Sequence, residues 1–208
     1  MSAFLGKIHY WLYNKIKLHE ELLENITDMA QRKGYNSEAL LSESYSKFGF
    51  PVKGLLENEI DHNNIHGWLQ QKIISAESRF AYVVTELLNN NVVKKEEIAD
   101  IFYKNGAEIM NRLDIKEGSP QDLFKLISDY MLEGMPCDRV NEIIESDDKM
   151  ITWKTITDIH KEYWDCVSGD VSNFNYFKDF WIEGFLSAGS KEYKHSRTDN
   201  GINTIMEV

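Results

Sequence analysis

Two histidines spaced four residues apart, His62 and His66, are the first side chains in this sequence whose arrangement suits chemistry. If a helix extends back to residue 62, both imidazoles lie on one face, and Glu59 lies one turn before His62. Glu-x-x-His is the pattern that supplies ligands in carboxylate-bridged dimetal helix bundles. Glu59 and His62 are therefore candidate metal ligands, and a dimetal carboxylate oxidase is one functional hypothesis. The alternative is that Asn63 or Asn64 caps the next helix and that His62 is solvated.

His66 also borders an apolar stripe and is followed by Gly67 and Trp68. An imidazole titrates near neutral pH, so a histidine beside an indole at a pocket rim suits general acid–base catalysis. We therefore expect His66 to be catalytic and Trp68 to bind substrate. The alternative is a histidine at the edge of the core that is hydrogen-bonded to a backbone carbonyl.

A second cluster of reactive and aromatic residues begins at position 160. His160 and Cys166 are of the types that form an activated thiolate pair. Tyr163 and Trp164 lie between them in sequence and are candidate substrate-binding residues. This spacing matches no recognised nucleophile signature, and the alternative is that Cys166 is a small buried thiol.

Two further residues are candidates for different reasons. Cys137 follows Gly134 and Pro136 in a tight turn that could display its thiol at a pocket edge. A plain connection from helix to strand explains the same turn, because Pro136 bars helix continuation. Trp181 belongs to an aromatic segment that could line an apolar ligand cavity. Aromatic residues at this spacing are also typical of a core or of a dimer face.

The elements that must position these side chains are helical in the first part of the chain. Apolar residues recur there with a period near 3.6, and glycine, asparagine and proline mark the ends of each run. Residues 34–54 interrupt the pattern and predict a loop or a broken helix, with Phe48 and Phe50 in the core. The predicted helices span residues 4–33, 65–88, 95–113 and 119–132.

The last part of the chain shows strand patterns around short polar turns. One turn lies at residues 146–149 and the other at Asp199-Asn200-Gly201, and each predicts an antiparallel hairpin. The predicted strands are residues 139–145, 150–157, 193–198 and 202–208. Between the hairpins, the sequence predicts a short helix or turn at 160–168 and an aromatic helix at 173–188.

This order of elements predicts an α+β fold, in which N-terminal helices precede a small antiparallel sheet with a crossing aromatic helix. Residues 1–54 are expected to pack, as a helix and loop, on an α+β core domain that spans residues 55–208.

The C-terminal half combines a hairpin around an acidic turn, an aromatic helix and a closing strand pair. The marked positions along these elements are Trp153, Thr155, His160, Trp164, Trp181 and Gly184. Together they resemble the bacterial L-2-amino-thiazoline-4-carboxylic acid hydrolase-like family and, more distantly, 4-vinyl reductase-type domains. The resemblance covers residues 65–208 by order of elements, and it implies an α+β fold and a hydrolase for a small heterocyclic or amide-like substrate. Members of that family tend to carry a cysteine after the second strand, where this chain has none before Cys166.

The composition argues against several classes of function. A formal net charge of -11 repels phosphate backbones and anionic lipids, so we expect neither nucleic-acid nor membrane binding. The first residues lack the apolar core of a signal peptide, and no run approaches the roughly 18 apolar residues of a membrane helix. With two cysteines in the chain, a reduced cytoplasm is the simplest location.

The leading hypothesis is a small-molecule enzyme or ligand-binding domain of the hydrolase type, with its pocket between the 65–88 helix and the sheet. His66 would be the acid–base residue. The accessory or nucleophilic groups would be His160, Cys166 and Cys137. The alternatives are a non-catalytic ligand sensor or homodimeric scaffold, and the dimetal oxidase. The metal ion of the last hypothesis is the one cofactor that the sequence leaves open.

Overall fold

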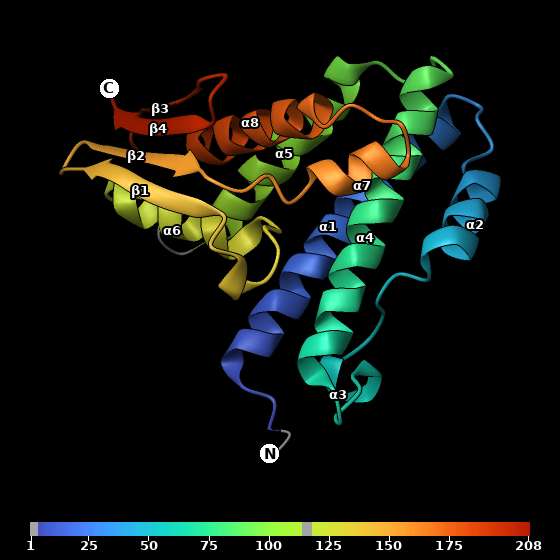
Figure 1. Ribbon diagram of the computed structural model, residues 1–208. Coiled ribbons are helices and arrows are strands. Elements are labelled where there is room, and N and C mark those ends of the chain that lie inside the picture. Colours follow the sequence, from blue (N-terminus) through green and yellow to red (C-terminus); the bar gives the residue numbers. More distant parts are fainter. Residues whose placement is uncertain (1–3, 114–117) are drawn as a thin grey trace. The chain divides into compact units, whose positions relative to one another are not determined.

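The protein has an α+β fold, with helices followed by a four-stranded antiparallel sheet (Figure 1). The computed structural model describes residues 4–113 and 118–208. The elements fall into two compact units, each of which combines segments distant in sequence. The first unit contains the described residues of Met1–Val93, Tyr130–Met135 and His160–Asp170, and the second those of Lys94–Asp129, Pro136–Ile159 and Val171–Val208.

The first unit is helical. Its helices are α1 (Lys7–Arg32), α2 (Ser37–Phe48), the one-turn α3 (Leu56–Glu59), α4 (Ile65–Asn89) and α7 (Lys161–Cys166). The long helices α1 and α4 lie side by side, and both α2 and α7 contact α4 (Figure 1). The apolar stripes that predicted α1 and α4 are the faces by which the two helices meet.

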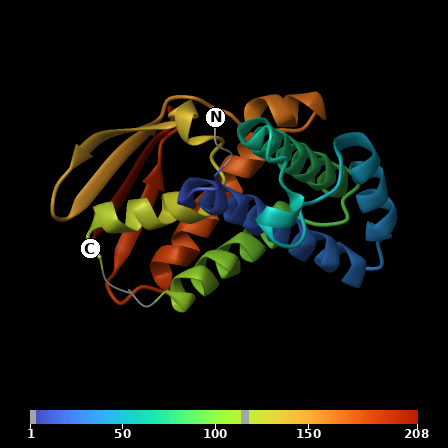
Figure 2. The ribbon, with the colours of Figure 1, turned by 90° about the horizontal axis from the view of Figure 1, so that it is seen from below.

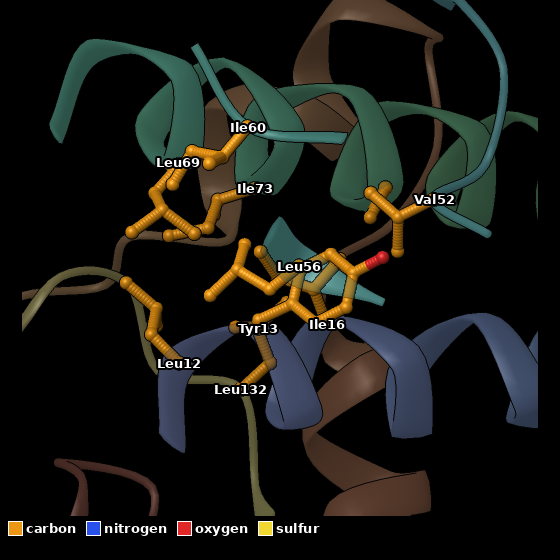
Figure 3. Packing of buried hydrophobic residues seen from close by; sticks show 10 residues of the cluster. Leu12, Tyr13, Ile16, Val52, Leu56, Ile60, Leu69, Ile73 and Leu132 are labelled. Carbon is orange, nitrogen blue, oxygen red and sulfur yellow. The ribbon is translucent and has the colours of Figure 1, made fainter. Parts of the chain in front are cut away.

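The core of this unit lies between the two long helices (Figure 3). Leu12 and Ile16 of α1 point toward Leu69 and Ile73 of α4, with Leu56 of α3 between them. All five side chains are buried. Removing one such side chain from water stabilises the fold by about 1.5–3 kcal/mol, so this contact holds α1 against α4.

Helix α4 begins with the asparagine cap that the sequence predicted. The Oδ1 atom of Asn64 accepts a hydrogen bond from the backbone N–H of Gly67 at 3.2 Å. The Asn64 amide packs directly over Gly67, so a Cβ at this position would require the amide to shift.

The segment after α1 differs from its prediction in the position of one side chain, Phe50. Its first part is the regular helix α2, which ends at Gly49, where φ is +88° and a side chain would be strained. Phe48 is half-buried, but Phe50 is 70% exposed, and its ring lies 5.4 Å from that of Tyr45. The expectation that Phe50 enters the core is therefore wrong, because the turn at Gly49 directs it outward.

The second unit contains the sheet. Its elements are α5 (Lys95–Arg112), α6 (Pro120–Tyr130), the 3₁₀ turn Pro136–Asp138, β1 (Asn141–Ser146), β2 (Met150–Thr155), α8 (Ser172–Ser187), β3 (Tyr193–Arg197) and β4 (Ile202–Glu207). The strand order is β1-β2-β4-β3, and every neighbouring pair is antiparallel. Both predicted hairpins are confirmed.

Helices α6 and α8 cover one face of this sheet. Trp153 of β2 lies opposite Asn203 of β4, which in turn lies opposite Arg197 of β3, so all three side chains share that face. The Trp153 ring is 4.8 Å from Phe124 of α6, and the Arg197 guanidinium forms a bidentate ion pair with Asp179 of α8. The predicted aromatic helix that crosses the sheet is therefore α8.

Helices α5 and α8 lie side by side at very short separation (Figure 2). A Cβ on Gly184 of α8 would collide with the backbone carbonyl of Tyr103, and one on Gly106 of α5 would collide with that of Trp181. Glycine at these two positions is what permits the close approach of the helices.

Residues on both sides of position 54, up to Val93, belong to the first unit. Among the helices of the described residues, none has the length and apolar character needed to cross a membrane.

Candidate functional site

A cluster of buried titratable side chains surrounds Glu77 in the first unit. Glu77 lies in the apolar stripe of α4 between Ile73 and Phe80, so the helix carries its carboxylate into the core, where the residue is 1% exposed. His160 precedes α7 and is 5% exposed. Its Nδ1 lies 3.1 Å from Oε2 of Glu77. Because an ionised carboxylate can only accept, Nδ1 of His160 donates this hydrogen bond.

His19 of α1 faces the same carboxylate oxygen from the other long helix. Its Nε2 lies 4.0 Å from Glu77 Oε2, a charge contact too long for a hydrogen bond. Its ring lies 4.7 Å from that of Phe80. Burial lowers the pKa of His19 below the ordinary 6.5, although the Glu77 charge opposes this shift. His19 is therefore neutral at pH 7.

Glu77 is an anion despite its burial. Burial raises its pKa, but the imidazoles of His160 and His19 and the hydrogen bond from His160 outweigh that effect. The pKa of Glu77 consequently lies below the ordinary 4.5. Its second oxygen, Oε1, has no hydrogen-bond partner among the described residues. Buried polar atoms are nearly always paired, so such an oxygen in a core is unusual. Oε1 of Glu77 can accept a hydrogen bond from a further group.

Two more buried polar atoms with unused capacity lie where α7 meets α4. Among the described residues, neither Nε1 of Trp164 nor Oγ1 of Thr85 has a hydrogen-bond partner. Gly169 lies against both residues, and a Cβ there would collide with Thr85 Oγ1. The Trp164 ring meets Phe80 edge-on at 6.3 Å, which links this region to the Glu77 cluster.

A second buried ion pair, Arg79–Glu20, joins the same two helices at positions next to His19 and two residues after Glu77. The Arg79 guanidinium contacts the Glu20 carboxylate of α1, and its Nη1 donates to the carbonyl oxygen of Gly49 at 2.6 Å and to the Ser75 hydroxyl. Burial raises the pKa of Glu20, and the charge of Arg79 acts against that shift. Arg79 therefore ties α1, α4 and the end of α2 together.

The Glu77–His160 pair has the geometry of an acid–base dyad. A carboxylate on Nδ1 fixes the tautomer and orientation of an imidazole and leaves Nε2 as the basic nitrogen. Desolvation together with a specific charge partner is also the environment that distinguishes functional titratable groups in proteins.

The second predicted cluster lies partly around this dyad. His160, Tyr163 and Trp164 are all buried at α7, whereas Cys166, the last residue of that helix, is exposed. The structure thus places the His160 ring in the interior and the Cys166 thiol at the surface.

His66 and Trp68 occupy a different part of the first unit. His66 is exposed on the first turn of α4, and its Nε2 lies 3.4 Å from Nε2 of His9 on α1. Trp68 is half-buried, with its ring 6.1 Å from that of Tyr13. The two predicted catalytic histidines therefore have different surroundings. His66 is exposed on the first turn of α4, whereas His160 is buried beside Glu77.

Glu59 and His62, the predicted metal ligands, are both exposed. His62 precedes α4 rather than lying on it, and its Nε2 is 3.4 Å from the carbonyl oxygen of Glu57. Within residues 4–113 and 118–208, no group of three or more His, Cys, Asp or Glu side chains is placed to hold a metal ion. His62 and His66 do not share a helical face, because the helix starts after His62.

Cys137 and Trp181 belong to the second unit. Cys137 is exposed, and its Sγ lies 3.9 Å from Oδ1 of Asp138. Trp181 is buried, and its Nε1 donates to Oδ1 of Asn105 at 2.8 Å. The Trp181 indole thus packs against α5 with its polar atom satisfied.

Two surface depressions of the first unit are large enough for a small molecule. One, of about 420 Å³, includes Lys17, Glu20 and Val52 in its lining. The other, of about 380 Å³, is lined by residues that include Trp68, Lys72 and Ser75. His160 and Glu77 line neither of them.

No protein-family model matches the chain, and neither a curated protein nor a solved structure is significantly similar to it.

Four buried residues of these two clusters were not predicted from the sequence: Glu77, His19, Glu20 and Arg79. One signal could have found them: each is a charged or titratable residue at a position that the helical period assigns to the buried face. Such residues are almost never fully buried unless they are paired. Their pairing was not visible, because the partners lie on other helices.

Proposed function

We propose that the protein is a small-molecule enzyme whose acid–base residue is His160, held by Glu77. The observation that carries this proposal is the 3.1 Å contact between His160 Nδ1 and Glu77 Oε2. Such a carboxylate orients the imidazole and stabilises the imidazolium that forms when Nε2 takes up a proton.

The reaction class that we infer is hydrolysis of a small heterocyclic or amide-like substrate, in line with the family resemblance of the C-terminal half. Nε2 of His160 takes a proton from the attacking water, the water oxygen bonds to the substrate carbon, and the proton passes to the nitrogen that leaves. Tyr163 and Trp164, which lie on the helix that follows this histidine, are the proposed substrate contacts. Cys166, the last residue of α7, is the proposed nucleophile of a covalent variant of this reaction.

The energetics of the Glu77 cluster support a role beyond stability. Removing ions from water costs several kcal/mol each, and replacing a buried ionic cluster with apolar side chains is often neutral or stabilising. The unused hydrogen-bond capacity of Glu77 Oε1 and Trp164 Nε1 lies in the same region. A buried ionic cluster that keeps open acceptors and donors is typical of a site that binds something.

The test measures hydrolysis of a panel of thiazolines, lactams and small amides by proton NMR. His160→Gln is expected to lower turnover by at least about 100-fold, the usual contribution of a general acid–base group. Lys161→Gln, at the exposed next position, is the matched control and is expected to keep the wild-type rate. His66→Ala in the same panel tests the other predicted catalytic histidine. Turnover that survives His160→Gln would contradict the proposal.

A non-catalytic ligand sensor or homodimeric scaffold is the second candidate. The observation in its favour is that neither described depression reaches His160 or Glu77. In that case the depression beside Trp68 takes the ligand and the Glu77 cluster fixes the helices. Native mass spectrometry of the purified protein separates the two candidates: a dimer that retains a ligand but hydrolyses no member of the panel favours the sensor or scaffold.

We further propose a reducing compartment, the cytoplasm, because both cysteines are free and exposed. The net charge of -11 supports a small molecule rather than a nucleic acid or an anionic membrane as the partner.

A further inference from the structure

His9 and His66 form a pair of imidazoles on two neighbouring helices, of which His66 is exposed and His9 is half-buried. His9 lies on the first turn of α1 and His66 on the first turn of α4, 57 positions apart in sequence. Their Nε2 atoms are 3.4 Å apart. The ring centroids are 5.4 Å apart and the planes are inclined by 51°, so the rings meet through their Nε2 edges and are not stacked.

The distance between the two nitrogens matches the edge of a metal coordination tetrahedron. With metal–nitrogen bonds of about 2.0–2.1 Å, two imidazole ligands of tetrahedral zinc lie about 3.3 Å apart. The backbone holds the two rings at this spacing because the core contact between α1 and α4 fixes the helices next to each other. Little rearrangement is therefore needed for both nitrogens to bind one ion.

We propose that His9 and His66 bind one divalent transition-metal ion of the zinc class through their Nε2 atoms. Imidazole nitrogen suits zinc, copper and nickel and does not suit magnesium or calcium. His66 is exposed and His9 is half-buried, so solvent reaches the pair and water completes the coordination. The ion cross-links the first turns of α1 and α4, and it stabilises the folded state because the unfolded chain does not hold the two rings together.

One existing contact limits the affinity of this site. The backbone N–H of Gly6 donates to Nδ1 of His9 at 2.9 Å, which favours the tautomer with its proton on Nε2. Metal binding at Nε2 moves that proton to Nδ1 and breaks the bond to Gly6. The loss of one hydrogen bond weakens binding by roughly fivefold relative to a ring without this contact.

The metal site predicted from the sequence was Glu59 with His62, whereas the site proposed from the structure is His9 with His66. His62 is exposed and bonds toward Glu57 outside the helix. It is therefore a control that matches both histidines in residue type and matches His66 in exposure.

The experiment is a calorimetric titration of the metal-free full-length protein with zinc chloride, with Cys137 and Cys166 replaced by serine so that the exposed thiols do not bind the ion. One zinc ion per chain is expected, and the His62→Ala variant is expected to bind equally well. His9→Ala and His66→Ala are each expected to weaken binding by more than about tenfold, since loss of even an outer-shell partner has that effect. Circular dichroism checks that each variant is folded.

Electron paramagnetic resonance of the copper-loaded protein gives a second readout that needs no variant, and coupling of the copper signal to two imidazole nitrogens is expected. Absence of zinc binding, equal binding in all variants, or loss of binding in His62→Ala but not in His9→Ala would overturn the proposal.

Discussion

Nδ1 of His160 lies 3.1 Å from Oε2 of Glu77, across 83 positions of sequence and in a region where both side chains are almost fully buried. This contact places a negative charge in a helical core and holds it there with the imidazole of the residue that precedes α7. Because the carboxylate touches a second imidazole, that of His19, any change at Glu77 acts on both histidines.

Glu77→Gln removes the charge while keeping the shape of the side chain. We expect it to lower the free energy of unfolding by about 1–3 kcal/mol at pH 7, because the acceptor of a charge-assisted hydrogen bond becomes a weaker, neutral one. Glu86→Gln, a half-buried position on the same helix, is the control and should change stability by less than about 0.5 kcal/mol. Urea unfolding of the three proteins measures the difference. Equal effects at the two positions would show that the Glu77 charge does not matter to the fold.

The neutral state of His19 predicts how stability depends on pH. Its folded pKa lies below the ordinary 6.5, so when the pH falls past 6.5 the unfolded chain takes up a proton that the folded chain does not. Stability from this group is therefore complete above pH 6.5 and declines below it, by at most about 1.4 kcal/mol per pH unit. The pKa of Glu77 is also lowered, so its contribution is present above pH 4.5 and declines as the pH falls further.

The His19→Gln variant isolates the first of these two windows. Glutamine does not titrate, so the variant should show a shallower fall in unfolding free energy between pH 6.5 and 5 than the wild-type protein does. Denaturant unfolding at a series of pH values gives both curves. If the two unfolding free energies fall equally with pH, His19 takes up its proton in the folded protein as readily as in the unfolded chain, which contradicts a lowered pKa.

The Arg79–Glu20 pair should show strong coupling. Arg79→Met leaves the Glu20 carboxylate buried without its partner and is expected to cost about 3–5 kcal/mol, whereas Glu20→Gln combined with Arg79→Met should cost less than the sum of the single changes. A double-mutant cycle in chemical denaturation measures the coupling. Additive effects would indicate that the two side chains do not interact.

Much of the fold was predictable because its signals are local. Asn64 caps α4, Pro120 opens α6, and Asp199-Asn200-Gly201 closes the second hairpin, and each acts through residues within one turn of itself. A local signal also explains why Phe50 was predicted wrongly. Its hydrophobicity suggested burial, but the positive φ of Gly49 determines its direction.

The candidate site was predictable only in part. His160 could be selected by its residue type, but its partner Glu77 comes from a helix that ends long before it in sequence. His66 was expected to share a helical face with His62 if the helix extended back that far, whereas its neighbour in space is His9, because the packing of α1 on α4 decides which first turns meet. Contacts between distant helices depend on tertiary packing, which local periodicity does not encode.

The close contact of α5 and α8 in the second unit depends on glycine. Gly184→Ala would bring a Cβ into the carbonyl oxygen of Tyr103, and the helices must separate to admit it. We expect a loss of about 2 kcal/mol or more, net of the better helix propensity of alanine. Glu183→Ala, one residue earlier and exposed, is the control and should be neutral or slightly stabilising. Thermal unfolding compares the two, and an unchanged midpoint for Gly184→Ala would refute the close contact.

The most direct test of the Glu77–His160 pair is NMR spectroscopy of the imidazole nitrogens at neutral pH, in the wild-type protein and in Glu77→Gln. The pair predicts a slowly exchanging proton on Nδ1 of His160, shifted downfield by its bond to the carboxylate, and the loss of that shift in Glu77→Gln. A proton found only on Nε2 of His160, or a His160 spectrum that is the same in both proteins, would contradict the pairing.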